Sequence, residues 1–207
     1  MACLKHNLTL YITSMKHRIL FIGDHFWGIE PCVGDLLADT LLVQHPRLPL
    51  EFSIQSSPRN TFDALFTNCP RDIIGRQAET TLLCVGWEDA KGILSANQCV
   101  EGLEKLLHEI RRNSQTKIIV CTIPTIQLQE DSLTRAKLTA CNQYLLALPQ
   151  DDWLQVADLD AAFKLYQAEQ SVRGDLARNL FTDSGTLGQL GKMLCVHVLM
   201  RNMKFSA

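Results

Sequence analysis

Four short segments of the chain combine side chains that can donate, accept or hold protons. They read GDHFWG (23–28), SSPRN (56–60), GWEDAKG (86–92) and FTDSGTLG (181–188). An imidazole at His25 beside a carboxylate of Glu88 or Asp183 would form an acid–base pair, because a nearby negative charge raises the pKa of a histidine. The same three side chains offer a metal ion one nitrogen and two carboxylates, which is a weak donor set. We therefore expect no metal and no cofactor. His25 is either a nucleophile or base in such chemistry, or a bulky, half-exposed side chain that fills space and has no chemical role, which is the interpretation we favour.

The elements that must position these segments alternate along the chain. Apolar runs predict strands, and apolar residues at helical spacing predict helices between them. We expect strands at 17–24, 50–56, 80–86, 117–125 and 152–159, and helices at 32–45, 60–68 (capped by Asn60), 95–114, 131–149 and 187–203. This alternation predicts an α/β fold, a three-layer α/β/α sandwich with a five-stranded, mainly parallel sheet. Residues 1–207 are expected to form one domain, with 1–16 as an extra N-terminal segment.

In open parallel sheets, ligands bind beyond the carboxyl ends of the strands. Three of the four polar segments directly follow predicted strands, so we expect them at that edge of the sheet. Some of their residues also have structural explanations. Asp24 is predicted to tie down its turn by accepting backbone hydrogen bonds, and Glu88 and Asp89 either cap the next element or face solvent. Trp27 and Trp87 form either an aromatic floor for a ligand or buried packing.

The composition excludes several classes of protein. The 207 residues carry a formal net charge of −2, and 46% of them are hydrophobic, which is typical of a soluble globular chain without a basic tract for nucleic acid. No segment reaches the roughly 18 apolar residues of a membrane span. The eight cysteines form no C-x-x-C pair, and several lie in apolar runs. We therefore predict reduced thiols, a cytoplasmic location and no membrane partner.

Several segments, in this order, resemble the sequence blocks of the SGNH or GDSL hydrolases. ILFIGDHFWG resembles block I, CVGWEDAKG resembles block III, and FTDSGTLGQLGK resembles block V. KIIVCTIPT resembles the strand of that family that ends in Thr-x-x-Pro. Asn142 matches an asparagine-bearing helix, and Asp158 matches an aspartate at the end of the following strand. The resemblance covers nearly the whole chain and implies an SGNH-hydrolase-like fold.

The functional residues of that family are replaced here. The resemblance puts the serine nucleophile on His25, the block II glycine near Ser56 or Ser57, the block III asparagine on Glu88, and the general base on Thr186. Only the aspartate that orients the base is retained, as Asp183. A threonine is no base near neutral pH, and a carboxylate in the oxyanion site repels the negative transition state. The resemblance therefore implies a degenerate member without the serine-esterase reaction.

From these observations we expect a non-catalytic binding or scaffolding domain, with a protein as its main partner. The expected binding surface surrounds the former pocket and comprises His25, Trp27, Ser57, Arg59, Trp87, Glu88, Asp89, Asp183 and Thr186. One alternative is a noncanonical ester hydrolase that uses His25 with Glu88 or Asp183. Another is an RNA-binding domain of the degenerate SGNH type, using basic residues expected near the same loops: Arg59, Arg71, Arg76 and Lys91. A small-molecule ligand in the former pocket is a further alternative.

Overall fold

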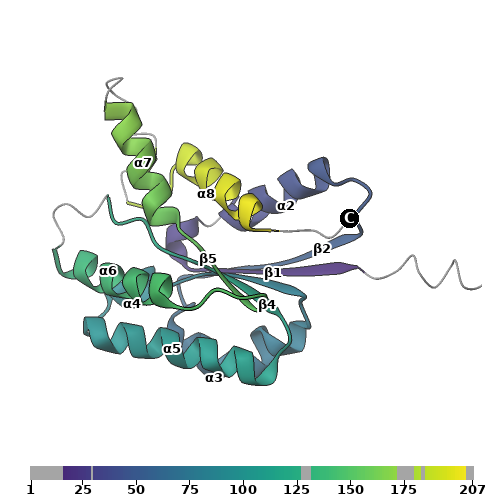
Figure 1. The fold of residues 1–207 in the computed structure, drawn as a ribbon, viewed down its shortest axis with the longest axis horizontal. Coiled ribbons are helices and arrows are strands. Elements are labelled where there is room, and N and C mark those ends of the chain that lie inside the picture. The colour runs from purple at the N-terminus through teal and green to yellow at the C-terminus, as the bar shows by residue number, and fades with distance from the viewer. Residues whose placement is uncertain (1–15, 29, 127–131, 172–179, 183–184, 204–207) are drawn as a thin grey trace, which may run out of the picture.

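A parallel sheet forms the centre of the molecule in the computed structural model, which describes residues 16–28, 30–126, 132–171, 180–182 and 185–203 (Figure 1). Within these residues the sheet has five strands in the order β2-β1-β3-β4-β5, and every neighbouring pair is parallel. The strands are β1 (His17–Gly23), β2 (Leu50–Ser56), β3 (Thr80–Cys84), β4 (Lys117–Cys121) and β5 (Leu154–Ala157). The predicted five-stranded α/β architecture is confirmed.

Helices cover both faces of the sheet and complete three layers. One face carries α2 (Val33–Gln44), α7 (Leu159–Ser171) and α8 (Gln189–Asn202), and the other carries α3 (Phe62–Asp72), α5 (Ala96–Asn113) and α6 (Ser132–Ala147) (Figure 1). Two short elements follow strand ends, namely the 3-10 turn η2 (His25–Trp27) after β1 and α4 (Trp87–Lys91) after β3. A second 3-10 turn, η3 (Ile74–Arg76), leads into β3. No helix in the described residues is long and apolar enough to span a membrane.

Strand β1 contributes to two separate hydrophobic cores. Ile19 and Phe21 belong to the cluster beneath α2 and α8, whereas Leu20 and Ile22 belong to the cluster beneath α3 and α5. Because both faces of a central parallel strand are covered, its side chains from Ile19 to Ile22 are apolar at successive rather than alternate positions. The burial of both faces explains the uninterrupted apolar run ILFI in the sequence.

The seven cysteines of the described residues are free and buried, which agrees with the prediction of reduced thiols. Cys84 and Cys121 lie on neighbouring strands, with 3.1 Å between their sulfur atoms. Burial raises the pKa of Cys84 and of Cys195 well above the usual thiol value. These side chains therefore act as small core hydrophobes, while Cys3 lies outside the described residues.

Several predicted element boundaries are wrong. Helix α3 is capped by the hydroxyl of Thr61, which accepts from Ala64 N (3.3 Å), and not by Asn60. The amide of Asn60 instead donates to the carbonyl oxygen of Gly23 (2.8 Å). Strand β3 ends at Cys84, two residues before the predicted end, because Gly86 takes a φ of 125° that turns the chain into α4. The helix α7 was absent from the sequence prediction.

A buried lysine holds the end of α4 in place. Lys137 on α6 is 3% exposed, and its ammonium donates to the carbonyl oxygens of Ala90 (3.0 Å) and Gly92 (2.7 Å). These carbonyls lie at the C-terminal end of α4, where the helix leaves them without intrahelical donors. Lys137 thereby fixes the element that carries Glu88.

We predict that Lys137→Met lowers the free energy of unfolding by about 1–3 kcal/mol, because the carbonyls of Ala90 and Gly92 lose a charged donor and the Ala90 carbonyl is buried. Urea denaturation of the wild type and the variant measures this loss. Lys105→Met is the control, since Lys105 is exposed on α5. Equal midpoints for the two variants would contradict the assigned role of Lys137.

Candidate functional site

The carboxyl edge of the sheet brings three of the four polar segments together with the turn that precedes α8. We call this surface the mouth and define it as residues 23–28, 56–60, 86–92 and 185–188. Its parts are joined by backbone hydrogen bonds: Ser57 N donates to Gly23 O (3.0 Å), and Leu187 N donates to Phe26 O (3.2 Å). His25, Ser57, Glu88 and Thr186 therefore lie at one edge, as the sequence predicts.

Asp24 is the buried anchor of the mouth. Its carboxylate has no exposed surface and accepts from the backbone N–H groups of Phe26 (3.0 Å), Gly86 (3.0 Å) and Trp87 (2.8 Å). Burial raises the pKa of Asp24 to about 7, the three N–H donors work in the opposite direction, and the charge of Glu88 adds to the rise. The prediction that Asp24 ties down its turn is confirmed, and the same carboxylate also holds the start of α4.

His25 is half-buried and begins η2 directly after Asp24. In the described part of the chain, no hydrogen bond or ion pair joins its imidazole to another side chain. Glu88 is half-buried in the first turn of α4. The third member of the predicted cluster, Asp183, lies outside the described residues. Within those residues, no three His, Cys, Asp or Glu side chains are grouped to hold a metal ion.

Two serines, the last residue of β2 and the one after it, close a turn. The hydroxyl of Ser56 donates to Gly28 O (2.9 Å), and the hydroxyl of Ser57 accepts from Arg59 N (3.2 Å). The backbone N–H of Ser57 is used by the Gly23 carbonyl. Ser57 therefore has no free backbone donor to offer an oxyanion at this position.

Thr186 is part of a tight turn before α8. Its hydroxyl lies 2.8 Å from the hydroxyl of Thr182, and its carbonyl oxygen accepts from Thr182 N (2.8 Å). Phe181 and Leu187 pair across the same turn. The position that the resemblance assigns to the general base thus holds a hydroxyl engaged in local structure.

Both tryptophans of the mouth are buried, which corrects the expectation that they offer a binding surface. Trp27 is 0% exposed and Trp87 is 5% exposed. Phe26 packs between them, with ring centroids 5.4 Å from Trp27 and 4.7 Å from Trp87. These three rings form the core beneath the mouth and give its loops a firm base rather than an aromatic floor for a ligand.

Asp89 is also buried, at 4% exposure, and serves as a cap instead of a binding residue. Both of its oxygens accept from Phe62 N (3.1 and 3.2 Å) at the start of α3. Burial raises the pKa of Asp89 to about 6. Of the two structural roles considered from the sequence, capping is the one observed.

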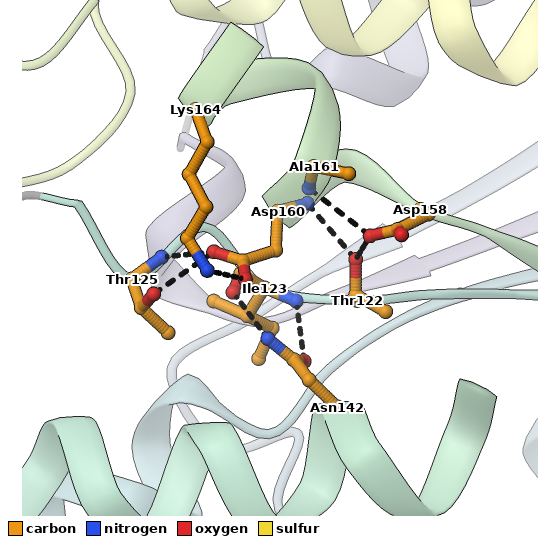
Figure 2. A network of polar contacts seen from close by, with 8 residues as sticks. All are labelled: Thr122, Ile123, Thr125, Asn142, Asp158, Asp160, Ala161 and Lys164. Atoms are coloured by element: carbon orange, nitrogen blue, oxygen red, sulfur yellow. Dashed lines mark hydrogen bonds and ion pairs between the residues drawn. The ribbon is translucent and has the colours of Figure 1, made fainter. Parts of the chain in front are cut away.

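Figure 2 shows the polar network at the ends of β4 and β5. Asp158 accepts from the hydroxyl of Thr122 (2.9 Å) and from Ala161 N (3.1 Å) in the first turn of α7. The Thr122 hydroxyl in turn accepts from Asp160 N (2.9 Å). Asp158 therefore starts a helix and joins it to β4, which is a structural task.

Asn142 fixes the chain after β4 in the same network (Figure 2). Its amide oxygen accepts from Ile123 N (2.9 Å), and its amide nitrogen donates to Ile123 O (2.8 Å). Asp160 accepts from both the backbone N–H and the hydroxyl of Thr125, and it pairs with Lys164. The polar side chains of this region thus hold loops and helix ends.

The basic residues expected around the mouth are dispersed. Arg59 is exposed after β2, and Lys91 is exposed at the end of α4. Arg71, at the end of α3, forms a two-pronged contact with Asp72 (2.7 and 2.8 Å). Arg76 lies in η3, which leads into the start of β3. The guanidinium nitrogens of Arg76 lie 3.1 Å from the side-chain amide of Gln55, the residue before Ser56 at the end of β2. The four basic side chains come from four different segments, and that of Arg71 is already paired with Asp72.

No protein-family model matches this sequence, and no curated protein matches it either. Solved structures do resemble it. A catalytic mutant of an acetylxylan esterase from Geobacillus stearothermophilus is 17% identical, with 92% of this chain and 95% of that one covered and a TM-score of 0.74. The lipase/acylhydrolase from Enterococcus faecalis is 18% identical, with 90% and 94% covered and a TM-score of 0.69. LAE5, an alpha/beta hydrolase enzyme from the metagenome of Lake Arreo, Spain, is 15% identical, with 89% and 94% covered and a TM-score of 0.73.

These likenesses concern whole chains at low identity, and they establish the fold. The chain has the three-layer fold of the SGNH hydrolases, as its sequence blocks imply. Fold alone does not carry activity, because chemistry depends on the residues placed on it.

We predict that Asp24→Asn lowers the free energy of unfolding by about 2–4 kcal/mol, because an amide NH₂ group would face backbone N–H donors and leave at least one of them without an acceptor. The loss should be larger at pH 5 than at pH 8. The folded-state pKa of Asp24, about 7, lies above the ordinary 3.8, so its contribution to stability is complete below the ordinary value and is lost as the pH rises through 7. Denaturant unfolding of both proteins across this range measures the effect.

Asp39→Asn is the matched control, since Asp39 is exposed on α2. Asp89 titrates in the same direction but is present in both proteins, so its effect cancels in the difference. Between pH 5 and pH 8 the difference should change by about 1–3 kcal/mol. A difference that stays constant, or that grows toward pH 8, would contradict the raised pKa of Asp24.

Proposed function

We propose that this chain is a non-catalytic binding or scaffolding protein built on an esterase fold, and that the mouth is its partner surface. One observation carries the proposal. The strand end where the resemblance puts a nucleophilic serine holds His25, whose imidazole has no side-chain partner in the described residues. The base position holds Thr186, whose hydroxyl lies against that of Thr182.

The chemistry of ester cleavage explains why this arrangement is unsuited to it. A serine esterase needs a hydroxyl, a base to take its proton and donors for the developing oxyanion. The backbone N–H of Ser57 is already used by Gly23. Glu88 would bring a negative charge beside the oxyanion, where one favourable donor is ordinarily worth roughly 3 kcal/mol. The positions of the nucleophile, the base and the oxyanion donors therefore all hold groups that do not suit ester cleavage.

The other carboxylates of this edge support the same conclusion. Asp24, Asp89, Asp158 and Asp160 each accept a backbone N–H, so their charges serve the loops. In the described residues of the mouth, Glu88 is the carboxylate without such a task. An edge of this kind holds several loops in fixed positions, which suits the recognition of a partner.

The partner surface consists of the polar residues of the mouth that reach solvent. His25, Ser57, Glu88 and Thr186 are half-buried, and Arg59 is exposed. The surface carries both signs of charge, with Arg59 and Glu88 on different loops. Arg59, Arg76 and Lys91 lie on different segments and Arg71 is paired with Asp72, so we infer less concentrated positive charge on this surface than favours RNA. A protein partner fits the surface better.

We predict no enzymatic turnover of para-nitrophenyl acetate or para-nitrophenyl butyrate by the purified protein. Exposed imidazoles cleave such activated esters slowly without an active site, so the observed rate should rise linearly with ester concentration. His25→Ala should lower that rate no more than His197→Ala, in which an exposed histidine of α8 is removed. Saturable turnover that disappears only in His25→Ala would establish the noncanonical hydrolase instead.

A charge exchange tests the partner surface. We predict that a protein retained from extract by the wild type is lost by the double variant Arg59→Glu with Glu88→Lys, which keeps the net charge of the chain. Arg112→Glu is the control, because Arg112 is exposed on α5 away from the mouth. Retention by all three proteins would exclude the mouth, and loss of the partner after ribonuclease treatment would show that RNA is bound.

A further inference from the structure

A cavity lies at the other edge of the sheet, where β5 begins and α5 ends. Its volume is about 230 Å³. Leu107, Leu148, Pro149 and Leu154 supply apolar walls, and Tyr144 and Trp153 add two aromatic rings. Leu154 is the first residue of β5, so this cavity and the mouth are separated by the length of the strands.

The size of the cavity limits its occupant. An apolar cavity of about 150 Å³ holds a benzene molecule. At about 230 Å³, this cavity has room for a larger flat body, such as two fused aromatic rings. Aliphatic and aromatic walls of this kind favour an apolar body through the area removed from water.

A fixed cation borders the cavity. The guanidinium of Arg111 lies 4.6 Å from the centre of the Trp153 ring, and its Nη1 lies 3.6 Å from an oxygen of Asp151. Asp151 is itself fixed, because its other oxygen accepts from Trp153 N and Leu154 N, both at 2.8 Å. The guanidinium is thus positioned by a ring on one side and a carboxylate on the other, and it retains further N–H donors.

The charges favour an anionic ligand over a cationic one. The carboxylate of Asp151 already has three partners, namely the backbone N–H groups of Leu154 and Trp153 and the guanidinium of Arg111. These partners hold the pKa of Asp151 below the usual value, and the Leu154 hydrogen bond has the largest effect. Among the described residues, the one carboxylate partner of Arg111 is Asp151, at 3.6 Å, which is longer than a strong hydrogen bond. A ligand carboxylate would therefore find donors on Arg111, whereas a ligand ammonium would meet its positive charge.

We propose that this cavity is a binding site for a small organic acid that joins a flat apolar body, about the size of two fused rings, to one carboxylate. The body packs between Tyr144, Trp153 and the leucines, and the carboxylate accepts from Arg111. This site is independent of the mouth. An experiment that finds no ligand in the cavity would therefore leave the proposed partner surface unaffected.

The test compares beta-naphthoate with its neutral counterpart beta-naphthamide. Each is titrated into the wild-type protein and followed by amide NMR spectra, which report both affinity and location. The wild type should bind the acid about tenfold more tightly than the amide, because a hydrogen bond to a charged group adds about that factor. Shifts should concentrate on the residues that line the cavity.

Arg111→Met keeps the apolar stem of the side chain and removes the charge. It should bind acid and amide equally, whereas Arg112→Met, the next residue of the same helix and outside this cavity, should keep the preference. Leu148→Trp, which fills the cavity, should bind neither. The proposal is overturned if the wild type shows no saturable binding, if it binds both compounds equally, or if the shifts map to the mouth.

Discussion

The carboxyl edge of the sheet depends on one buried carboxylate. Asp24 leaves β1 and accepts three backbone N–H groups, one from its own turn and two from the start of α4. The ends of β1 and β3 are thereby held at a fixed separation. Since His25 and Glu88 are each within two residues of a group bonded to Asp24, their positions follow from this contact.

The same principle governs the rest of that edge. Asp89 holds the start of α3, Asp158 holds the start of α7, and Asn142 holds the chain after β4. Polar side chains that look reactive in the sequence therefore accept hydrogen bonds from backbone N–H groups that have no acceptor within a strand or helix. The groups that shape the loops differ from the groups that would attack an ester, so under the proposed function this edge keeps its hydrolase-like shape without the reaction.

The sequence was sufficient to predict the strands of the sheet, but it was insufficient to predict which side chains are exposed at the site. Apolar runs located all five strands because the central ones are buried on both faces. Helix α7 was missed, because the predicted strand 152–159 ran over its first residue and its start depends on a contact between Asp158 and Thr122, which follows a different strand. The sequence left open whether Trp27 and Trp87 form a ligand surface or buried packing, since their environment depends on how distant segments pack together.

The division of β1 between two cores constrains how this protein can change over evolutionary time. Adding or removing one residue within β1 would exchange Leu20 and Ile22 with Ile19 and Phe21, and both cores would lose their fit at once. Directly beyond the strand, Asp24, Phe26 and Trp27 are buried, whereas His25 is half-buried and belongs to neither core cluster. The strand thus fixes the register of both cores, and a change of residue type at position 25 leaves the composition of both cores as it is.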